Sequence, residues 1–508
     1  MGASLLISVL AGGSPTPITA VGSRVIDATP GAVKDWAIRN LGTNDKPFLL
    51  TGIFTAIAVL AAVTGIIAWR SRRLALGLTT MLGLIGFAAA AADRTTLVSP
   101  FAKVLPAVVA LIVSVGLLWW FTRGWDADDV PEPASQPAPT SADLVVLNEE
   151  NPAPAGFDRR AFLAAAMVSG AVAATGFGTS KLFGNLGARS RDSITLPKAA
   201  DAAGPVKAAY GFDVKGLSPY ITPNNNFYRV DTALSVPQVD AGSWSLKIHG
   251  LVDKEIELSY ADLLAMPLIE RRVTLACVSN EVGGHYAGNA AWLGVRTSDL
   301  FKQLGIKAEA DAVKSTSVDG MTIGTPLSAL TDGREAMIAI GMNGEPLPLA
   351  HGFPARMVVP GLYGYVSATK WVTELEVTTF SAFNAYWTDR GFSEQAPIKL
   401  FSRIDVPTSF AQLSKGKNAV AGVAWDQNTG ISKVEVRVDG GDWQPAKLAE
   451  QDTIETWRQW LYEWDAPAGQ HTIEVRATDA DGKTQTSRRV APRPDGATGW
   501  HSVAVTVT

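Results

Sequence analysis

Three long apolar stretches near the N-terminus constrain the fold of this chain more than any other feature. They cover residues 47–68, 74–92 and 104–121. Each approaches the roughly 20 apolar residues that a helix needs to cross a bilayer. Trp119 and Trp120 stand where an interfacial aromatic belt is expected. Residues 1–125 are therefore predicted to form a transmembrane helical region.

Two shorter elements precede these stretches. The apolar run at residues 4–10 is interrupted by glycine and proline before it reaches spanning length. It could be a signal-like core, a re-entrant segment or the end of a helix. Residues 25–41 carry apolar side chains on one side of a helical pattern, which predicts an amphipathic helix at the membrane interface.

Charged residues predict the topology. Arg70, Arg72 and Arg73 lie between the first two stretches and place that loop in the cytoplasm. The third stretch then ends in the cytoplasm, and residues 126–158 form an acidic, proline-rich linker. Arg159 and Arg160 open an apolar segment, residues 159–180, that resembles a twin-arginine export signal and is expected to remain as an anchor. The alternative is that the two arginines only mark the cytoplasmic end of a span.

The rest of the chain is polar and divides into two patterns. The net charge of −4 gives no reason to expect a nucleic-acid partner. Residues 204–400 mix short strands and short helices without a βαβ repeat, which favours an α+β domain. Residues 401–508 contain alternating runs, at 434–438 and 473–477, with Asp-Gly turn signals, which predicts an immunoglobulin-like β-sandwich.

Cys277 is the only cysteine of the 508 residues, so no intrachain disulfide can form. It follows a predicted buried strand and opens a loop rich in small and polar residues, including Ser279, Asn280 and Gly283. A thiolate in such a place can coordinate a soft metal. The alternative is a buried structural cysteine, since free cysteine behaves as a small hydrophobe.

Two further stretches accompany Thr274-Leu275-Ala276-Cys277. One is Asn-Asn-Asn-Phe-Tyr-Arg-Val at residues 224–230, and the other runs from His351 to Trp371. In this order they resemble the sulfite oxidase family of molybdopterin enzymes, which includes the catalytic subunit of the bacterial periplasmic methionine-sulfoxide reductase. The resemblance covers about residues 205 to 508. It implies a sulfite-oxidase-like catalytic domain that holds one molybdenum on one molybdopterin. Because cytoplasmic enzymes insert this cofactor, the domain must fold before export, which the twin-arginine route permits.

The resemblance assigns roles residue by residue. Cys277 is the implied metal ligand, and Arg356 and Lys370 are the natural partners of the pterin phosphate. Arg229 and Glu281 are expected near the substrate. The implied cofactor-binding residues are Asn225, Tyr228, Arg229, Cys277, Ser317, His351, Arg356, Ser367, Thr369 and Lys370. Ser317 is the least anchored of these. His351 could instead only cap a turn, and Arg229 could form a plain salt bridge.

Departures from the family bear on the substrate. Sulfite oxidases usually follow the cysteine with Ala-Gly-Asn-Arg, whereas this chain has Val-Ser-Asn-Glu at residues 278–281. A carboxylate at Glu281 would disfavour an anionic substrate such as sulfite if it points inward. The family's active-site tyrosine has no obvious counterpart, because the alignment places Met321 or Thr322 there. Oxygen-atom transfer on a small S-oxo compound, either sulfite-dehydrogenase-like or sulfoxide-reductase-like, is the predicted function.

The electron partner is predicted to be a separate molecule. All five histidines, His249, His285, His351, His471 and His501, lie outside the predicted spans, so a bis-histidine haem within these spans is excluded. A quinone, a cytochrome or a membrane haem protein must then exchange electrons with the site. Within the family the C-terminal domain mediates dimerisation, which implies a homodimer. A multi-pass bacterial membrane protein with its catalytic domain outside the cytoplasm is expected. The alternative is a membrane-tethered sensor or adhesion protein that keeps the fold without catalysis.

Overall fold

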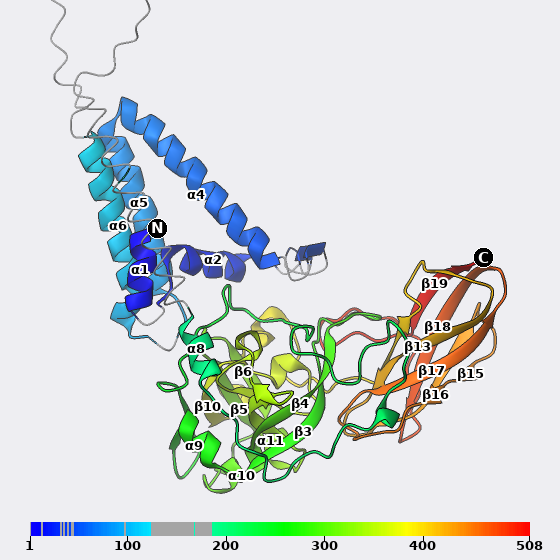
Figure 1. The fold of residues 1–508 in the computed structure, drawn as a ribbon. Helices are drawn as coiled ribbons and strands as arrows, with labels where there is room; N and C mark the ends of the chain where they lie inside the picture. Colours follow the sequence, from blue (N-terminus) through cyan, green and yellow to red (C-terminus); the bar gives the residue numbers. More distant parts are fainter. Residues whose placement is uncertain are drawn as a thin grey trace, which may run out of the picture. The chain divides into compact units, whose positions relative to one another are not determined.

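The computed structural model describes residues 2–11, 14–30, 33, 36–37, 40–41, 45–95, 98–122, 167 and 185–508. The chain forms two compact units, Met1–Asn185 and Leu186–Thr508. Figure 1 shows the helical first unit and the strand-rich second unit, which are described separately below. The predicted linker at 126–158 and the export segment at 159–180 lie almost entirely outside the described residues.

The first unit contains the three predicted apolar helices. They are α4 (Asp45–Arg70), α5 (Arg72–Ala91) and α6 (Pro100–Thr122). By length and composition each is able to cross a membrane, with mean hydropathies of 2.3, 1.9 and 2.4. The described part of the chain thus confirms three apolar helices of spanning length close to the expected positions.

Two shorter helices differ from expectation. Helix α1 (Gly2–Leu10) has nine residues, which is too short to cross a bilayer. The helix expected at 25–41 is interrupted: α2 (Pro17–Ala28), which begins at the side-chain cap of Thr16, ends inside this range, and the described residues 33, 36–37 and 40–41 are helical again beyond the break. Thr29 is extended because it precedes Pro30, and the ring of a proline disfavours helical geometry in the residue before it. The prediction of one continuous interfacial helix from 25 to 41 was therefore wrong.

The part of the second unit that was predicted as an α+β domain is built on two sheets. The first is mixed, in the order β2 (Ile256–Ser259), β1 (Ser245–Gly250), β10 (Val372–Thr378), β5 (Ala312–Ser317) and β6 (Thr322–Pro326). The second is antiparallel, in the order β3 (Leu268–Ala276), β4 (Ala287–Arg296), β7 (Met337–Met342) and β8 (Glu345–Pro346), with β9 (Arg356–Val358) also on β7. The helices are α8 (Leu186–Asp192), α9 (Tyr260–Ala265), α10 (Thr297–Lys302) and α11 (Leu327–Thr331).

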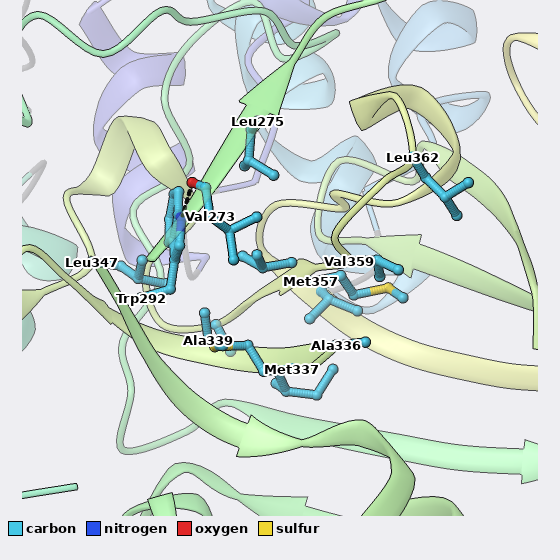
Figure 2. Close-up of a cluster of buried hydrophobic side chains, with 14 of the residues drawn as sticks. Val273, Leu275, Trp292, Ala336, Met337, Ala339, Leu347, Met357, Val359 and Leu362 are labelled. Atoms are coloured by element: carbon cyan, nitrogen blue, oxygen red, sulfur yellow. Dashed lines mark hydrogen bonds between the residues drawn. The ribbon is translucent and has the colours of Figure 1, made fainter. Parts of the chain in front are cut away.

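A dense apolar core supports the strand that leads to Cys277. Figure 2 shows Val273 and Leu275 of β3 beside Trp292 and Met357, and all four side chains are almost fully buried. The indole Nε1 of Trp292 donates a hydrogen bond of 3.2 Å to the carbonyl of Val273. Burying a large apolar side chain contributes roughly 1.5–3 kcal/mol. The packing therefore holds the end of β3, and with it the position of Cys277, in a fixed place.

The C-terminal strands form two packed sheets, which confirms the immunoglobulin-like sandwich. One sheet has the order β11 (Phe401–Val406), β13 (Gly416–Trp425), β17 (Arg458–Ala466) and β16 (Lys447–Leu448). The other has β12 (Gln412–Leu413), β19 (His501–Val507), β18 (Gly469–Asp479), β14 (Ile431–Val438) and β15 (Gln444–Pro445). The expected turn at Asp439 and Gly440 is present, with φ of 53° and 71°.

Buried ion-pair and hydrogen-bond contacts join β3 to the sandwich. The guanidinium of Arg272 forms a bidentate ion pair with Asp452, in which Nη2 donates to Oδ1 at 2.9 Å. The backbone N–H of Thr274 donates to the carbonyl of Glu455 at 3.0 Å, and the Thr274 hydroxyl accepts from the N–H of Trp457 at 2.8 Å. The α+β part and the sandwich therefore pack as one unit around the strand that precedes the cysteine.

Candidate active site

Cys277 occupies the first position after β3, where the chain turns away from the sheet. Its N–H donates to the carbonyl of Tyr286 at 2.9 Å, and its own carbonyl accepts from the N–H of Asn280 at 3.0 Å. The Asn280 side chain closes the loop by accepting from the N–H of Tyr286 at 2.8 Å. Burial raises the pKa of the Cys277 thiol, while hydrogen bonds from Ser279 and the charge of Lys370 act in the opposite direction.

The thiol lines a pocket whose empty space, including the part open to solvent, is about 810 Å³. Six of the predicted site residues line it: Tyr228, Cys277, Ser317, His351, Arg356 and Lys370. The fold thus brings side chains from four separated segments to one cavity.

Arg356 is a buried cation that the described protein does not neutralise. Its side chain is on β9, and its guanidinium donates only to the carbonyls of Met357, His351 and Ala368, at 3.3, 3.1 and 3.4 Å. It also lies over the ring of Trp292, 4.9 Å from the centroid. Burial lowers the pKa of Arg356 to about 10, so it remains charged near neutral pH. A buried guanidinium without a carboxylate partner among the described residues is suited to an anionic ligand.

Lys370 and Arg229 share one carboxylate. The ammonium of Lys370 and the Nε of Arg229 each donate to Oδ2 of Asp231 at 2.7 Å. Burial lowers the pKa of Lys370 to about 8, and the nearby Asp231 opposes that shift. Arg229 does not itself line the pocket. Its salt bridge with Asp231 matches the plain interpretation left open from the sequence.

His351 and Tyr228 form part of the wall. The Nε2–H of His351 donates a hydrogen bond of 2.9 Å to the carbonyl of Asn224, because a carbonyl oxygen can only accept. Burial and then the charge of Arg356 lower the pKa of His351 to about 4, which keeps the imidazole neutral. Burial likewise raises the pKa of Tyr228.

Besides Arg229, four more of the predicted residues do not line the pocket. Asn225 and Glu281 are exposed and do not line the pocket. Ser367 and Thr369 are fully buried, but their hydroxyls bond to Leu362 and Tyr363 carbonyls and to Ser315, respectively. Alternate residues on an extended segment point to opposite sides, so Thr369 faces the core while Lys370 faces the pocket. The placement of Glu281 contradicts the expectation that its carboxylate faces a substrate there.

Several pocket residues were not predicted from the sequence. Asp231 lies two residues after Arg229 in an extended stretch. Because residues two apart in an extended chain point to the same side, this spacing could have predicted that Asp231 and Arg229 lie together. Asp319 also lines the pocket and accepts a hydrogen bond from Thr232 at 2.8 Å. Met321 lines it as well, whereas Thr322 does not. The aromatic residues Tyr365, Trp387 and Phe392 also line the pocket, and no motif in the sequence marked them as a group.

Comparisons with known proteins agree with this geometry. Residues 233–387 match the oxidoreductase molybdopterin binding domain, and residues 402–475 match a bacterial Ig domain. Mitochondrial sulfite oxidase of Homo sapiens is 31% identical over 342 residues, which cover 57% of this chain and 62% of that protein. An uncharacterized oxidoreductase, YuiH, of Bacillus subtilis is 32% identical over 176 residues, which cover 34% of this chain and 85% of that protein.

A solved structure shares the fold. The sulfane dehydrogenase SoxCD of Paracoccus pantotrophus superimposes with a TM-score of 0.51 at 22% identity, covering 59% of this chain and 85% of that chain. The second unit thus contains a molybdopterin-binding oxidoreductase domain followed by an Ig-like domain. The chain belongs to the sulfite oxidase family of molybdopterin-dependent oxidoreductases. It spans 62% of the length of the human relative.

The residues of the pocket fit the cofactor that this family membership indicates, Mo-molybdopterin. The unneutralised Arg356 offers a guanidinium to a phosphate, and Lys370 adds a second cation beside it. Cys277 offers the soft sulfur that molybdenum prefers on the same cavity wall. These three residues are the ones that would hold the group.

Proposed function

We propose that this protein is a membrane-anchored molybdenum oxidoreductase that transfers an oxygen atom to or from a small S-oxo compound. One observation carries the proposal: Cys277 and the buried, unneutralised Arg356 line the same pocket. A soft metal ligand and a phosphate partner serve no purpose together in a protein that only adheres or senses. They do serve a cofactor that carries both a metal and a phosphate.

The cofactor, when bound, supplies two-electron redox chemistry and exchange of an oxo group. The chain's own residues position the reactants. Arg356 and Lys370 fix the phosphate end, and Asp231 holds the Lys370 ammonium in place. The hydrogen bond from the neutral ring of His351 to the carbonyl of Asn224 fixes the orientation of the ring in the pocket lining. Burial of the thiol restricts water at Cys277.

Electrons must pass between this site and a second molecule. In the reducing direction a sulfoxide takes up two electrons and two protons and yields a sulfide and water. In the oxidising direction sulfite and water yield sulfate, two protons and two electrons. We propose that a quinone, a cytochrome or a membrane haem protein is the electron carrier, since no histidine lies in the helices α4, α5 and α6.

We also propose that the catalytic domain lies outside the cytoplasm. Arg70, Arg72 and Arg73 stand between α4 and α5, which favours a cytoplasmic position for that junction. A fourth crossing at residues 159–180, led by Arg159 and Arg160, would then carry everything after it outward. A homodimer through the sandwich is part of the same proposal and rests on the family resemblance alone.

The test is metal and cofactor analysis of the purified full-length protein with an Arg356→Met variant beside it. We expect about one molybdenum and one pterin per chain in the wild type. Turnover of sulfite or a sulfoxide with dye acceptors or donors should accompany them. The variant should lose most of the pterin, because an apolar side chain cannot bind the phosphate. Lys302→Met, a change at an exposed lysine, is the control and should retain the molybdenum and the pterin of the wild type. A wild type that contains no molybdenum after expression in a molybdopterin-producing host would overturn the proposal.

A further inference from the structure

Helix α8 is the first element of the second unit, and it is fixed to the body of that unit. A Cβ built on the buried Gly187 would lie 3.0 Å from the backbone nitrogen of Val239, so the helix and that backbone are in direct contact. The N–H of Ala241 donates a hydrogen bond of 2.9 Å to the hydroxyl of Ser190 on the same helix. The helix therefore packs as part of the unit that holds the cofactor pocket, although it follows the segment proposed to anchor the chain in the membrane.

Arg191 in α8 binds three consecutive residues that lead toward the pocket. Its Nε donates to the carbonyls of Pro346 and Leu347 at 3.1 and 3.0 Å. Its Nη2 forms an ion pair of 2.7 Å with the carboxylate of Glu345. A short helical turn that ends at His351 follows directly. Arg191 thus holds the backbone that carries His351 into the pocket lining.

Glu345 extends this contact to the hydrogen-bond acceptor of the His351 ring. Its Oε1 accepts a hydrogen bond from the Nδ2 of Asn224, whose carbonyl accepts the ring N–H of His351 at 2.9 Å. The Oδ1 of Asn224 also accepts from the Nδ2 of Asn343 at 2.8 Å. Hydrogen bonds from Arg191 and then Asn224 lower the pKa of Glu345, so its carboxylate is ionised near neutral pH. A continuous series of polar contacts therefore joins Arg191 to the ring of His351.

His351 in turn contacts Arg356, the residue suited to the cofactor phosphate. The backbone carbonyl of His351 accepts a hydrogen bond from Nη1 of Arg356 at 3.1 Å, whereas the bonds from this guanidinium to two other carbonyls are 3.3 and 3.4 Å long. The His351 ring packs edge-to-face on Phe227, with centroids 5.5 Å apart. A shift of residues 345–351 would therefore move part of the pocket lining and an acceptor of its buried cation together.

We propose that Arg191 is a positioning residue of the cofactor site, because it fixes both the backbone before His351 and the acceptor of the His351 ring. Arg191 does not itself line the pocket, so it acts through these neighbours. This inference rests on the proposed function for the role of Arg356 as the phosphate partner, and it holds for either direction of the oxygen-atom transfer. Retention of the cofactor then depends on the residues that join the catalytic domain to its membrane anchor.

Release of the pterin from the detergent-purified full chain tests this role. We expect the release rate, followed by pterin fluorescence, to rise about fivefold in Arg191→Ala, which corresponds to about 1 kcal/mol. Arg437→Ala on the sandwich is the matched control, because the Arg437–Glu474 pair is also 2.7 Å long and its arginine is 24% exposed, against 20% for Arg191. Its release rate should stay within about twofold of the wild type.

Chemical labelling of the histidines gives a second readout that needs no cofactor. Diethyl pyrocarbonate acylates neutral imidazole, and burial followed by a neighbouring arginine charge lowers the pKa values of both His351 and His501 to about 4. In protein from a host without molybdopterin, Arg191→Ala should raise the labelling rate of His351 about fivefold. His501 should keep its wild-type rate. Peptide mass spectrometry measures both, and a general loss of stability would expose the two histidines alike.

Two milder variants test the route through the carboxylate and serve if Arg191→Ala fails to fold. Glu345→Gln removes the ion pair and keeps an acceptor for Asn224, so it should raise pterin release about as much as Arg191→Ala. The double variant should add little to either change, because the two residues act through one contact. Arg191→Lys keeps the charge but has a single donor group, and its release rate should fall between those of the wild type and Arg191→Ala.

Wild-type pterin release and wild-type labelling of His351 in Arg191→Ala and Glu345→Gln would overturn this inference. Equal gains in labelling at His351 and His501 would also overturn it, since they would leave Arg191 with a role in stability alone. A wild type that never contains molybdenum would instead overturn the proposed function. In that case the labelling of His351 in the cofactor-free chain still decides whether Arg191 positions the site.

Discussion

The chemistry of Cys277 depends on what surrounds its sulfur. Burial alone holds the pKa of the thiol above its usual range, so the isolated side chain favours the protonated form. A metal reverses this, because coordination stabilises the thiolate directly. Lys370 and Ser279 already favour the anion. The residue is thus a poor free nucleophile and a suitable ligand.

Replacing Cys277 by serine should abolish turnover, because a hydroxyl is a far weaker ligand for a soft metal. The pterin content should remain close to that of the wild type, since Arg356 and Lys370 are untouched. Activity and pterin fluorescence of the purified variant measure the two effects. Wild-type turnover in Cys277→Ser would show that the thiol is not the metal ligand.

The strand β3 is the element on which the site depends. Its inner side is held by the core of Figure 2, and its end is held by the sandwich through Arg272 and Thr274. Both charged groups of the Arg272–Asp452 pair are almost fully buried, with 7% and 5% of the side chain exposed. Asp452 also accepts a hydrogen bond from Tyr220 at 2.7 Å. The ion pair therefore links three segments.

Removing one partner of this buried pair should be costly. Arg272→Ala leaves Asp452 buried without its counter-charge, so we expect a loss of about 3–5 kcal/mol in the free energy of unfolding. The exposed Lys302–Asp299 pair is the control, and Lys302→Ala should cost less than about 1 kcal/mol. Chemical denaturation followed by tryptophan fluorescence measures both. Equal losses in the two variants would show that burial does not strengthen the first pair.

His501 on β19 is a second contact between the sandwich and the loop that follows Cys277. Its Nδ1 accepts the N–H of Ile404 at 3.0 Å, and a side chain at Gly283 would collide with its ring. Burial and then the charge of Arg403 lower the pKa of His501 from 6.5 to about 4. The folded state thus binds fewer protons than the unfolded state between these two values. The contribution of His501 to the free energy of unfolding is therefore fully present above pH 6.5, and it is lost as the pH falls toward 4.

We therefore expect the full chain to melt at lower temperature as the pH falls from 6.5 to 4, with at most about 3 kcal/mol lost through His501. His501→Gln should flatten this part of the profile, because glutamine does not titrate. The hydrogen bond that His471 donates to the Asp439 carboxylate raises the pKa of His471, so His471→Gln should instead remove stability present at low pH. Thermal melts across this range compare the three proteins. An unchanged slope in His501→Gln would contradict the assignment.

At the scale of the whole molecule, the proposed position of the catalytic domain outside the cytoplasm depends on segments before residue 185. Replacing Arg159 and Arg160 by lysine keeps the positive charge but removes the twin-arginine pair. We expect the catalytic domain of the double variant to stay on the cytoplasmic side. Protease added to intact cells should then cleave the wild type and spare the variant. Cleavage of both would leave the arginines with only a topogenic role.

The sequence by itself determined the elements whose signals are local. Twenty consecutive apolar residues must be helical in a bilayer, so α4, α5 and α6 were predictable from composition. Alternation and turn residues predicted the sandwich, and the ordered motifs around Cys277, Arg356 and Lys370 predicted the cofactor pocket. The expected 25–41 helix is not continuous, because Pro30 disfavours helical geometry at Thr29.

Only the tertiary structure decided which side chains face the pocket. Glu281 and Cys277 are four residues apart, yet the turn closed by Asn280 leaves one exposed and the other buried. Thr369 and Lys370 are adjacent, and only Lys370 lines the cavity. In the pocket lining, the ring of Tyr365 contacts that of Phe392, which lies more than twenty positions later in the sequence. Contacts at such separations depend on how the chain folds back on itself, and no local pattern records them.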